Sequence, residues 1–305
     1  MKTIIGYIKG YFYESDKTLL LFTTLLAASL IFLNYYFHID DHISDSNLFV
    51  ARLGWRYIIF LVAFGLPYLC YSIINNKALF SQPNFIILVL LAPIIFSVKA
   101  GLRLDFPIAA DPALNSYWNH ILYWPFLLLL VIVMLWICWK IWDREQPFYG
   151  TVRSDLNWKP YWLMLVFMIP LVAAASTQHD FLEVYPKLQL IVDDNTQMQL
   201  TPWHKLLFEL SYGSDFIGIE LFFRGFLVLA FLKWAGKDAI LPMACFYCTI
   251  HFGKPLGECI SSYFGGLLLG IVVSNTRSMW GGLMVHLGIA WLMELGGYIG
   301  TLLQK

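Results

Sequence analysis

Charged residues are scarce in this sequence. Only 13% of its 305 residues are Asp, Glu, Lys or Arg, and 59% are hydrophobic, whereas a soluble domain carries about 25% charged residues. The formal net charge is zero, so no basic surface suggests nucleic acid as a partner. This composition indicates an all-α, polytopic membrane protein whose first partner is the lipid bilayer.

Three other sequence signals are missing. No small-residue cleavage site follows the first apolar run, which is too long for a signal-peptide core, so we interpret that run as a retained span. Cys245 and Cys248 lack the second ligand pair that a zinc site needs, and we interpret the five cysteines as small packing residues. The sequence contains no internal or inverted repeat, which argues against a transporter.

Apolar windows close to the roughly 20 residues that a helix needs to cross a bilayer recur along the chain. We predict about nine spans, with eight as the alternative, at residues 18–39, 57–76, 78–98, 112–139, 160–179, 213–234, 239–252, 257–276 and 279–303. The spans divide the chain into residues 1–200, with the first five helices and their loops, and residues 201–305, a functional core. Lysine and arginine are more frequent on one side, which predicts that the N-terminus is inside.

Ionisable residues are concentrated in the last four predicted spans. Glu220 and Arg224 lie four residues apart, so on an α-helix each would offset the desolvation of the other. An arginine near the middle of a span costs about 2.5–3.5 kcal/mol even on lenient insertion scales. His251 and His286 follow in the next apolar stretches. Together these residues predict a polar site inside the membrane.

These residue types suit hydrolysis, in which a carboxylate or imidazole activates water and hydrogen-bond donors stabilise an oxyanion. Because the Arg224 cation would lower the basicity of Glu220, we expect Glu220 to orient a histidine or a water. A structural clamp is the alternative for the Glu220–Arg224 pair, and an interfacial polar group is the alternative for each histidine. Glu220, His251 and His286 are also zinc-type ligands. The sequence leaves the cofactor open between none and a divalent metal such as zinc.

Three segments resemble the signatures of one family. GIELFFRGFL, which contains Glu220 and Arg224, resembles the first signature, E-E-x-x-x-R, of the CAAX protease and bacteriocin-processing (CPBP, or Abi) family of intramembrane proteases. YCTIH, from Tyr247 to His251, is similar to the second signature, an aromatic residue followed by three residues and His. The segment ending in His286 is similar to the third, H-x-x-x-N. The resemblance covers about residues 202–298 and includes the type II CAAX prenyl endopeptidases.

The resemblance implies roles for individual residues. In the family, the first glutamate and the second-signature histidine activate water, and the last histidine and asparagine form the oxyanion hole. Carried over, this makes His251 and His286 catalytic. Glu220 supports them, and Arg224 and Tyr247 orient the site. Two signatures are degenerate, because Ile219 stands at the first glutamate and Ala290 at the asparagine.

Another carboxylate would have to replace the missing glutamate. Glu258 is the candidate, because it follows His251 by seven residues across a Gly-Lys-Pro turn, and Glu294 is a second. Each has a helix-end carboxylate as its alternative interpretation. The predicted catalytic set is therefore Glu220, His251, His286 and Glu258.

The predicted function is that of an intramembrane endopeptidase. It hydrolyses a peptide bond near the membrane through a Glu/His-activated water, and its substrate is a peptide or membrane protein. The expected location is the bacterial cytoplasmic (inner) membrane. The alternative is a degenerate family member that binds a peptide, lipid or partner protein in the same intramembrane cavity.

Overall fold

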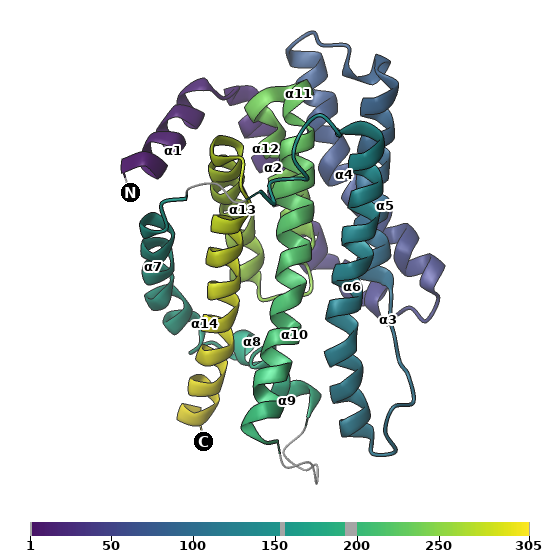
Figure 1. Ribbon diagram of the computed structural model, residues 1–305, viewed down its shortest axis with the longest axis vertical. Helices are drawn as coiled ribbons and strands as arrows, with labels where there is room; N and C mark the ends of the chain where they lie inside the picture. Colours follow the sequence, from purple (N-terminus) through teal and green to yellow (C-terminus); the bar gives the residue numbers. More distant parts are fainter. Residues whose placement is uncertain (1, 153–155, 193–199, 305) are drawn as a thin grey trace. The chain divides into compact units, whose positions relative to one another are not determined.

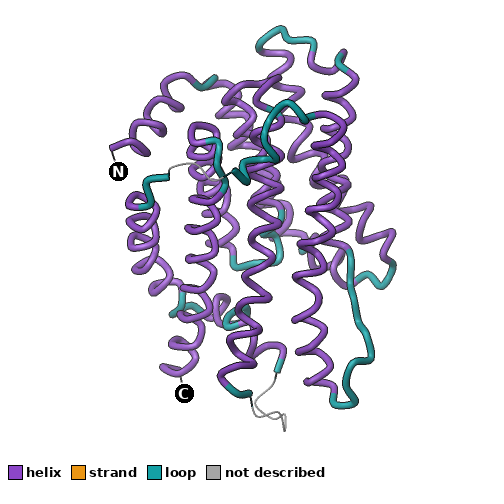
Figure 2. Tube along the Cα trace, viewed as in Figure 1, coloured by secondary structure: helices purple, strands orange, loops and turns teal. Residues whose placement is uncertain are grey.

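The computed structural model describes residues 2–152, 156–192 and 200–304, and over these residues the chain is helical and has no strand (Figure 2). A chain that crosses a bilayer must satisfy its backbone polar groups internally, and helices do so within one segment. The all-α class predicted from composition is confirmed, and several helices are suited to a membrane.

Six helices in the described part of the chain are long and apolar enough to cross a membrane, and each coincides with a predicted span. They are α2 (Lys17–Phe37), α4 (Phe49–Ile74), α5 (Pro83–Gly101), α6 (Pro112–Trp142), α13 (Leu256–Thr276) and α14 (Trp280–Gln304).

The remaining three predicted spans are also helical but differ from simple spanning helices. α7 (Lys159–Ala175) has 17 residues and α12 (Ile240–Thr249) has 10. The predicted span 213–234 lies in a longer helix that is divided between α10 (Pro202–Glu220) and η2 (Leu221–Ala230). By length and composition, the described residues therefore contain six spanning helices where the sequence predicts about nine.

Contacts divide the chain into two compact units, each assembled from three stretches. Unit 1 comprises Met1–Leu102, Val133–Asp155 and Leu221–Met279, and unit 2 comprises Arg103–Ile132, Leu156–Glu220 and Trp280–Lys305. The helix α6 and the α10–η2 helix each pass from one unit to the other along the chain. The division at residue 200, which follows chain order, stays a prediction.

Unit 1 is built around α12. This helix contacts α2, α4, α13 and η2, and all ten of its residues are buried. Gly270 lets α13 come close, because a Cβ atom at Gly270 would lie 2.6 Å from the Met243 methyl carbon of α12. The unit also contains α1 (Lys2–Glu14), α3 (Ile39–Asp45), η1 (Leu79–Ser81), α11 (Leu232–Ala235) and η3 (Gly236–Ala239).

Unit 2 is built around α14, which lies between α7 and α10 (Figure 1). Gly288 lets α7 pack directly on α14, because a Cβ atom there would lie 2.6 Å from the Leu165 side chain. On the other side, aromatic residues of α6 and α10 form an apolar cluster with Leu283 and Ala290 of α14. Two short helices, α8 (His179–Leu182) and α9 (Lys187–Ile191), complete the unit.

Candidate functional site

The first group of predicted site residues lies in unit 2. His286 Nδ1 is 2.9 Å from Glu220 Oε1, and the Glu220 side chain is fully buried while that of His286 is 14% exposed. An ionised carboxylate can only accept a hydrogen bond, so it places a proton on Nδ1 and leaves Nε2 as the nitrogen available to another group. The ring of Phe216 packs edge-on against the imidazole, with centroids 4.8 Å apart. Phe216 and Glu220, four residues apart on α10, thus hold the His286 ring between them.

The second group lies in unit 1. The Arg224 guanidinium carbon is 3.9 Å from the ring centroid of Tyr247, which is the geometry of a cation–π contact. The Tyr247 ring meets the His251 ring with centroids 4.8 Å apart. His251 Nδ1 lies 3.0 Å from the backbone carbonyl of Tyr247, so Nδ1–H donates and Nε2 carries the lone pair.

Local chain geometry explains this second group. Tyr247 and His251 are one helical turn apart where α12 ends at Thr249, so the His251 imidazole reaches back to the last turn of the helix. Arg224 is fully buried on η2, which packs against α12. The aromatic position of the YCTIH segment therefore contacts both the arginine of the first segment and the histidine of its own.

The helix between Glu220 and Arg224 is not regular. α10 ends at Glu220, and the hydrogen bonding widens to that of a π-helix over Leu221–Ala230. Such segments close bonds from residue i to i+5 and are frequent at functional sites. The sequence predicts a plain α-helix here, so the regular i,i+4 geometry is wrong. The Glu220–Arg224 ion pair itself stays a prediction.

A loop packs directly on the π-helical segment. Tyr149 and Gly150 have positive φ angles of 37° and 75°, which turn the loop toward the helix. A Cβ atom at Gly225 would lie 2.5 Å from the Tyr149 carbonyl oxygen. Glycine is therefore required next to Arg224 by this close approach.

The second predicted carboxylate, Glu258, lies in the first turn of α13. Its Oε1 is 4.0 Å from Lys254 Nζ, and both side chains are partly buried. An acidic residue in a first helical turn is also favoured by the helix dipole. The catalytic role of Glu258 stays a prediction.

Glu294 has a clear structural role. It is buried, and its Oε2 accepts a hydrogen bond of 2.9 Å from the backbone N–H of Lys187, the first residue of α9. Glu294 lies inside α14 and not at its end, so its carboxylate caps the start of another helix, α9.

The two residues that depart from the family pattern, Ile219 and Ala290, have apolar surroundings. Ala290 is buried in the aromatic cluster of unit 2, and Ile219 packs against the same cluster. Among the described residues, no group of three or more His, Cys, Asp or Glu side chains is arranged to hold a metal ion.

Sequence reasoning missed two contributors: Phe216, which packs on His286, and the π-helical segment. Phe216 precedes Glu220 by four residues on α10, so helical spacing alone could have placed it on the same face as Glu220. No residue type in LFFRGFLVLA marks a π-helix, apart from the glycine that the loop requires.

A comparison with known families gives one match. Residues 206–292 match one family, type II CAAX prenyl endopeptidase Rce1-like. The Rce1-like region contains Glu220, Arg224, Tyr247, His251 and His286, and it confirms the resemblance seen in the sequence. No curated protein and no solved structure matches the chain.

Proposed function

We propose that the chain is an intramembrane endopeptidase of the Rce1-like kind, which hydrolyses a peptide bond near the membrane with a Glu/His-activated water. The observation that carries the proposal is the Rce1-like match over residues 206–292, because it spans every predicted catalytic residue. The helices that are long and apolar enough to cross a membrane support a location in the bilayer, where a peptide or membrane-protein substrate would be cut.

His251 is proposed as the general base. Its Nδ1 proton is held by the Tyr247 carbonyl, so Nε2 has a lone pair that can accept a proton from water. Arg224 stacks on Tyr247 and thereby fixes the aromatic ring against which His251 packs. Glu258 is the proposed carboxylate partner in water activation. It would take the role of the family glutamate whose position is occupied here by Ile219.

His286 is proposed to stabilise the oxyanion. Glu220 holds the Nδ1 side of its ring, so a proton on Nε2 would be directed at a developing negative charge. Because Nδ1–H already donates to the carboxylate, a donor at Nε2 requires the ring to carry both protons. Loss of one oxyanion donor typically lowers kcat about 10²–10³-fold.

The test is cleavage of a membrane-tethered peptide library by the purified full chain in nanodiscs. We expect His251→Ala to lower cleavage at least about 100-fold, because a general base contributes about 10²–10⁴-fold. Glu258→Gln should abolish cleavage with the fold intact. His179→Ala is the matched control, since that histidine is largely exposed. Cleavage that survives the His251 substitution would refute the proposed mechanism.

The packing of Ile219 and Ala290 favours a second candidate, a degenerate member that binds a peptide, lipid or partner protein without cutting it. The two candidates are separated by one pair of variants. The binding protein is supported if the wild-type chain shows no cleavage, if Ile219→Glu creates cleavage, and if Glu258→Gln changes nothing.

A further inference from the structure

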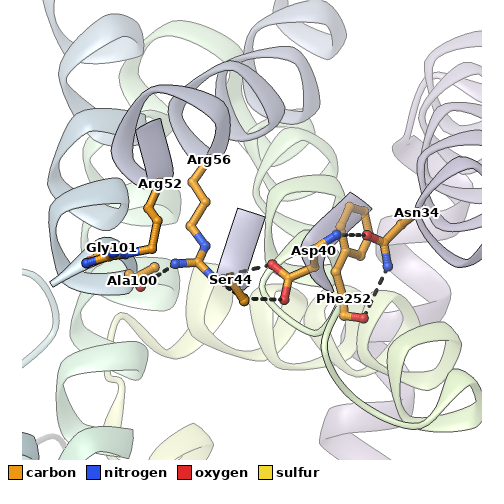
Figure 3. A network of polar contacts seen from close by, with 8 residues as sticks. All are labelled: Asn34, Asp40, Ser44, Arg52, Arg56, Ala100, Gly101 and Phe252. Carbon is orange, nitrogen blue, oxygen red and sulfur yellow. Dashed lines mark hydrogen bonds and ion pairs between the residues drawn. The ribbon is translucent and has the colours of Figure 1, made fainter. Parts of the chain in front are cut away.

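The turn that carries His251 is tied to a polar network at one end of α2, α3, α4 and α5 (Figure 3). Asn34, buried in the last turn of α2, has both ends of its amide engaged. Its Nδ2 donates to the Phe252 carbonyl at 3.1 Å, and its Oδ1 accepts from the Asp40 backbone N–H at 3.0 Å. One side chain therefore links the start of α3 to the residue that follows His251.

The neighbouring residue makes a second attachment. Tyr35 OH donates to the Lys254 carbonyl at 2.6 Å. Within the turn, Lys254 N–H donates to the His251 carbonyl at 3.0 Å. Two consecutive residues of α2 thus hold the backbone on the C-terminal side of His251, while its imidazole is held by Tyr247 on the other.

The network behind Asn34 is braced from two further helices. Arg56 Nη2 lies 3.4 Å from Asp40 Oδ1 and donates to Ser44 Oγ at 2.9 Å, and Ser44 donates to Asp40 Oδ2 at 3.2 Å. Arg56 Nη1 also donates to the Ala100 carbonyl at the end of α5, 2.6 Å away.

The turn also packs tightly on this network. A Cβ atom at Gly253 would lie 3.0 Å from Asp40 Oδ2, so the turn lies directly against α3. Since Asp40 is fixed by α4 and α5, its backbone N–H offers Asn34 a rigid anchor.

We infer that Asn34 and Tyr35 are positioning residues for His251: through the Phe252 and Lys254 carbonyls they fix the turn, and with it the direction of His251 Nε2. The catalytic part of this inference rests on the proposed endopeptidase function. A misplacement of about 1 Å at a reacting group can cost about 100-fold in rate. Loss of these hydrogen bonds is therefore expected to lower turnover.

Kinetics of the full chain in nanodiscs test the catalytic part. Asn34→Ala removes both contacts of the amide, and Asn34→Asp keeps an acceptor for Asp40 N–H but removes the donor to Phe252. Tyr35→Phe removes only the hydroxyl. We expect each to lower kcat about tenfold or more, with KM changed less than about twofold, because chemistry and not binding depends on Nε2. Asn75→Ala is the matched control, since Asn75 Nδ2 donates to a helix carbonyl, Tyr71, away from the turn.

The tautomer of His251 gives a readout that needs no activity. With ¹⁵N-labelled histidine, assigned by its loss in His251→Gln, the wild-type ring should show a single neutral form with the proton on Nδ1. In Asn34→Ala and in Tyr35→Phe the Nδ1–H bond to Tyr247 should loosen, and the second tautomer should appear.

These results separate the two proposals. A mixed tautomer in the variants of a chain without any peptidase activity would support the positioning role and refute the proposed function. The positioning role would be overturned if the Tyr35→Phe and Asn34→Asp variants kept both the single His251 tautomer and the kcat of the wild-type chain. This holds whatever happens to the fold of Asn34→Ala.

Discussion

Glu220 is fully buried, and within unit 2 its Oε1 lies 2.9 Å from Nδ1 of His286. Truncating one member of such a pair leaves the other polar group buried, and a lost hydrogen bond of this kind costs about 1–3 kcal/mol. The two side chains should therefore behave as one energetic unit, even if neither touches a substrate.

A double-mutant cycle tests this at the residue scale. We expect Glu220→Ala and His286→Ala each to lower the free energy of unfolding, and the double variant to lose about 0.5–3 kcal/mol less than the sum. Unfolding in detergent micelles, followed by far-UV circular dichroism, provides the measurement. The cycle of Glu220→Ala with His179→Ala is the control and should be additive, because His179 is largely exposed. Additivity in both cycles would contradict the coupling.

At the scale of elements, the π-helical segment is in close contact with the loop at Tyr149. Gly225→Ala would place a methyl group 2.5 Å from the Tyr149 carbonyl, and overpacking of this kind costs about 1–3 kcal/mol. Gly265→Ala on α13 is the matched control, because no atom lies within 4 Å of its added methyl, and there we expect a gain of about 0.4–1 kcal/mol. Equal midpoints in detergent unfolding for the two variants would show that the close contact is not rigid.

The elements also show which features could be predicted from the sequence. Hydropathy located the six long apolar helices of the described residues, because about 20 apolar residues have few other solutions in lipid. It gave no sign of the short helices α1, α3, α8 and α9. The segment signatures located His251 and His286. The π-helix could not be predicted, since no residue type in LFFRGFLVLA marks it, and the loop that packs on it, at Tyr149–Gly150, lies some 75 residues earlier in the chain. The link from Asn34 to the His251 turn could not be predicted either. A hydrogen bond from a side chain to a backbone carbonyl 218 residues away in the chain produces no periodic pattern in the sequence.

For the whole molecule, the inside location of the N-terminus is still a prediction. Within unit 1, Lys237 pairs with Glu14 at 2.7 Å, and Lys233 pairs with Asp143 at 2.8 Å, so lysines gather at the end that includes α1. Cytoplasmic loops carry the excess of lysine and arginine. The loop that contains Ala78 should therefore face the cytoplasm, and the loop that contains Asn47 should face outward.

Cysteine labelling tests this orientation. In a Cys70→Ser background, where the other four cysteines are buried, a membrane-impermeant maleimide should label Asn47→Cys in intact cells. Ala78→Cys should be labelled only after permeabilisation. Both positions are exposed, so accessibility within the protein does not differ. The reverse pattern would place the N-terminus outside.

The short length of α12 has a consequence for biosynthesis. Ten residues rise only about 15 Å, half of a hydrocarbon core of about 30 Å. Such a segment offers the insertion machinery too little apolar length to be recognised alone. Its partners α2 and α4 leave the ribosome before it, but α13, which packs along it, is made afterwards. The segment that ends in the YCTIH signature should therefore insert into the bilayer late, together with α13, after that helix has left the ribosome.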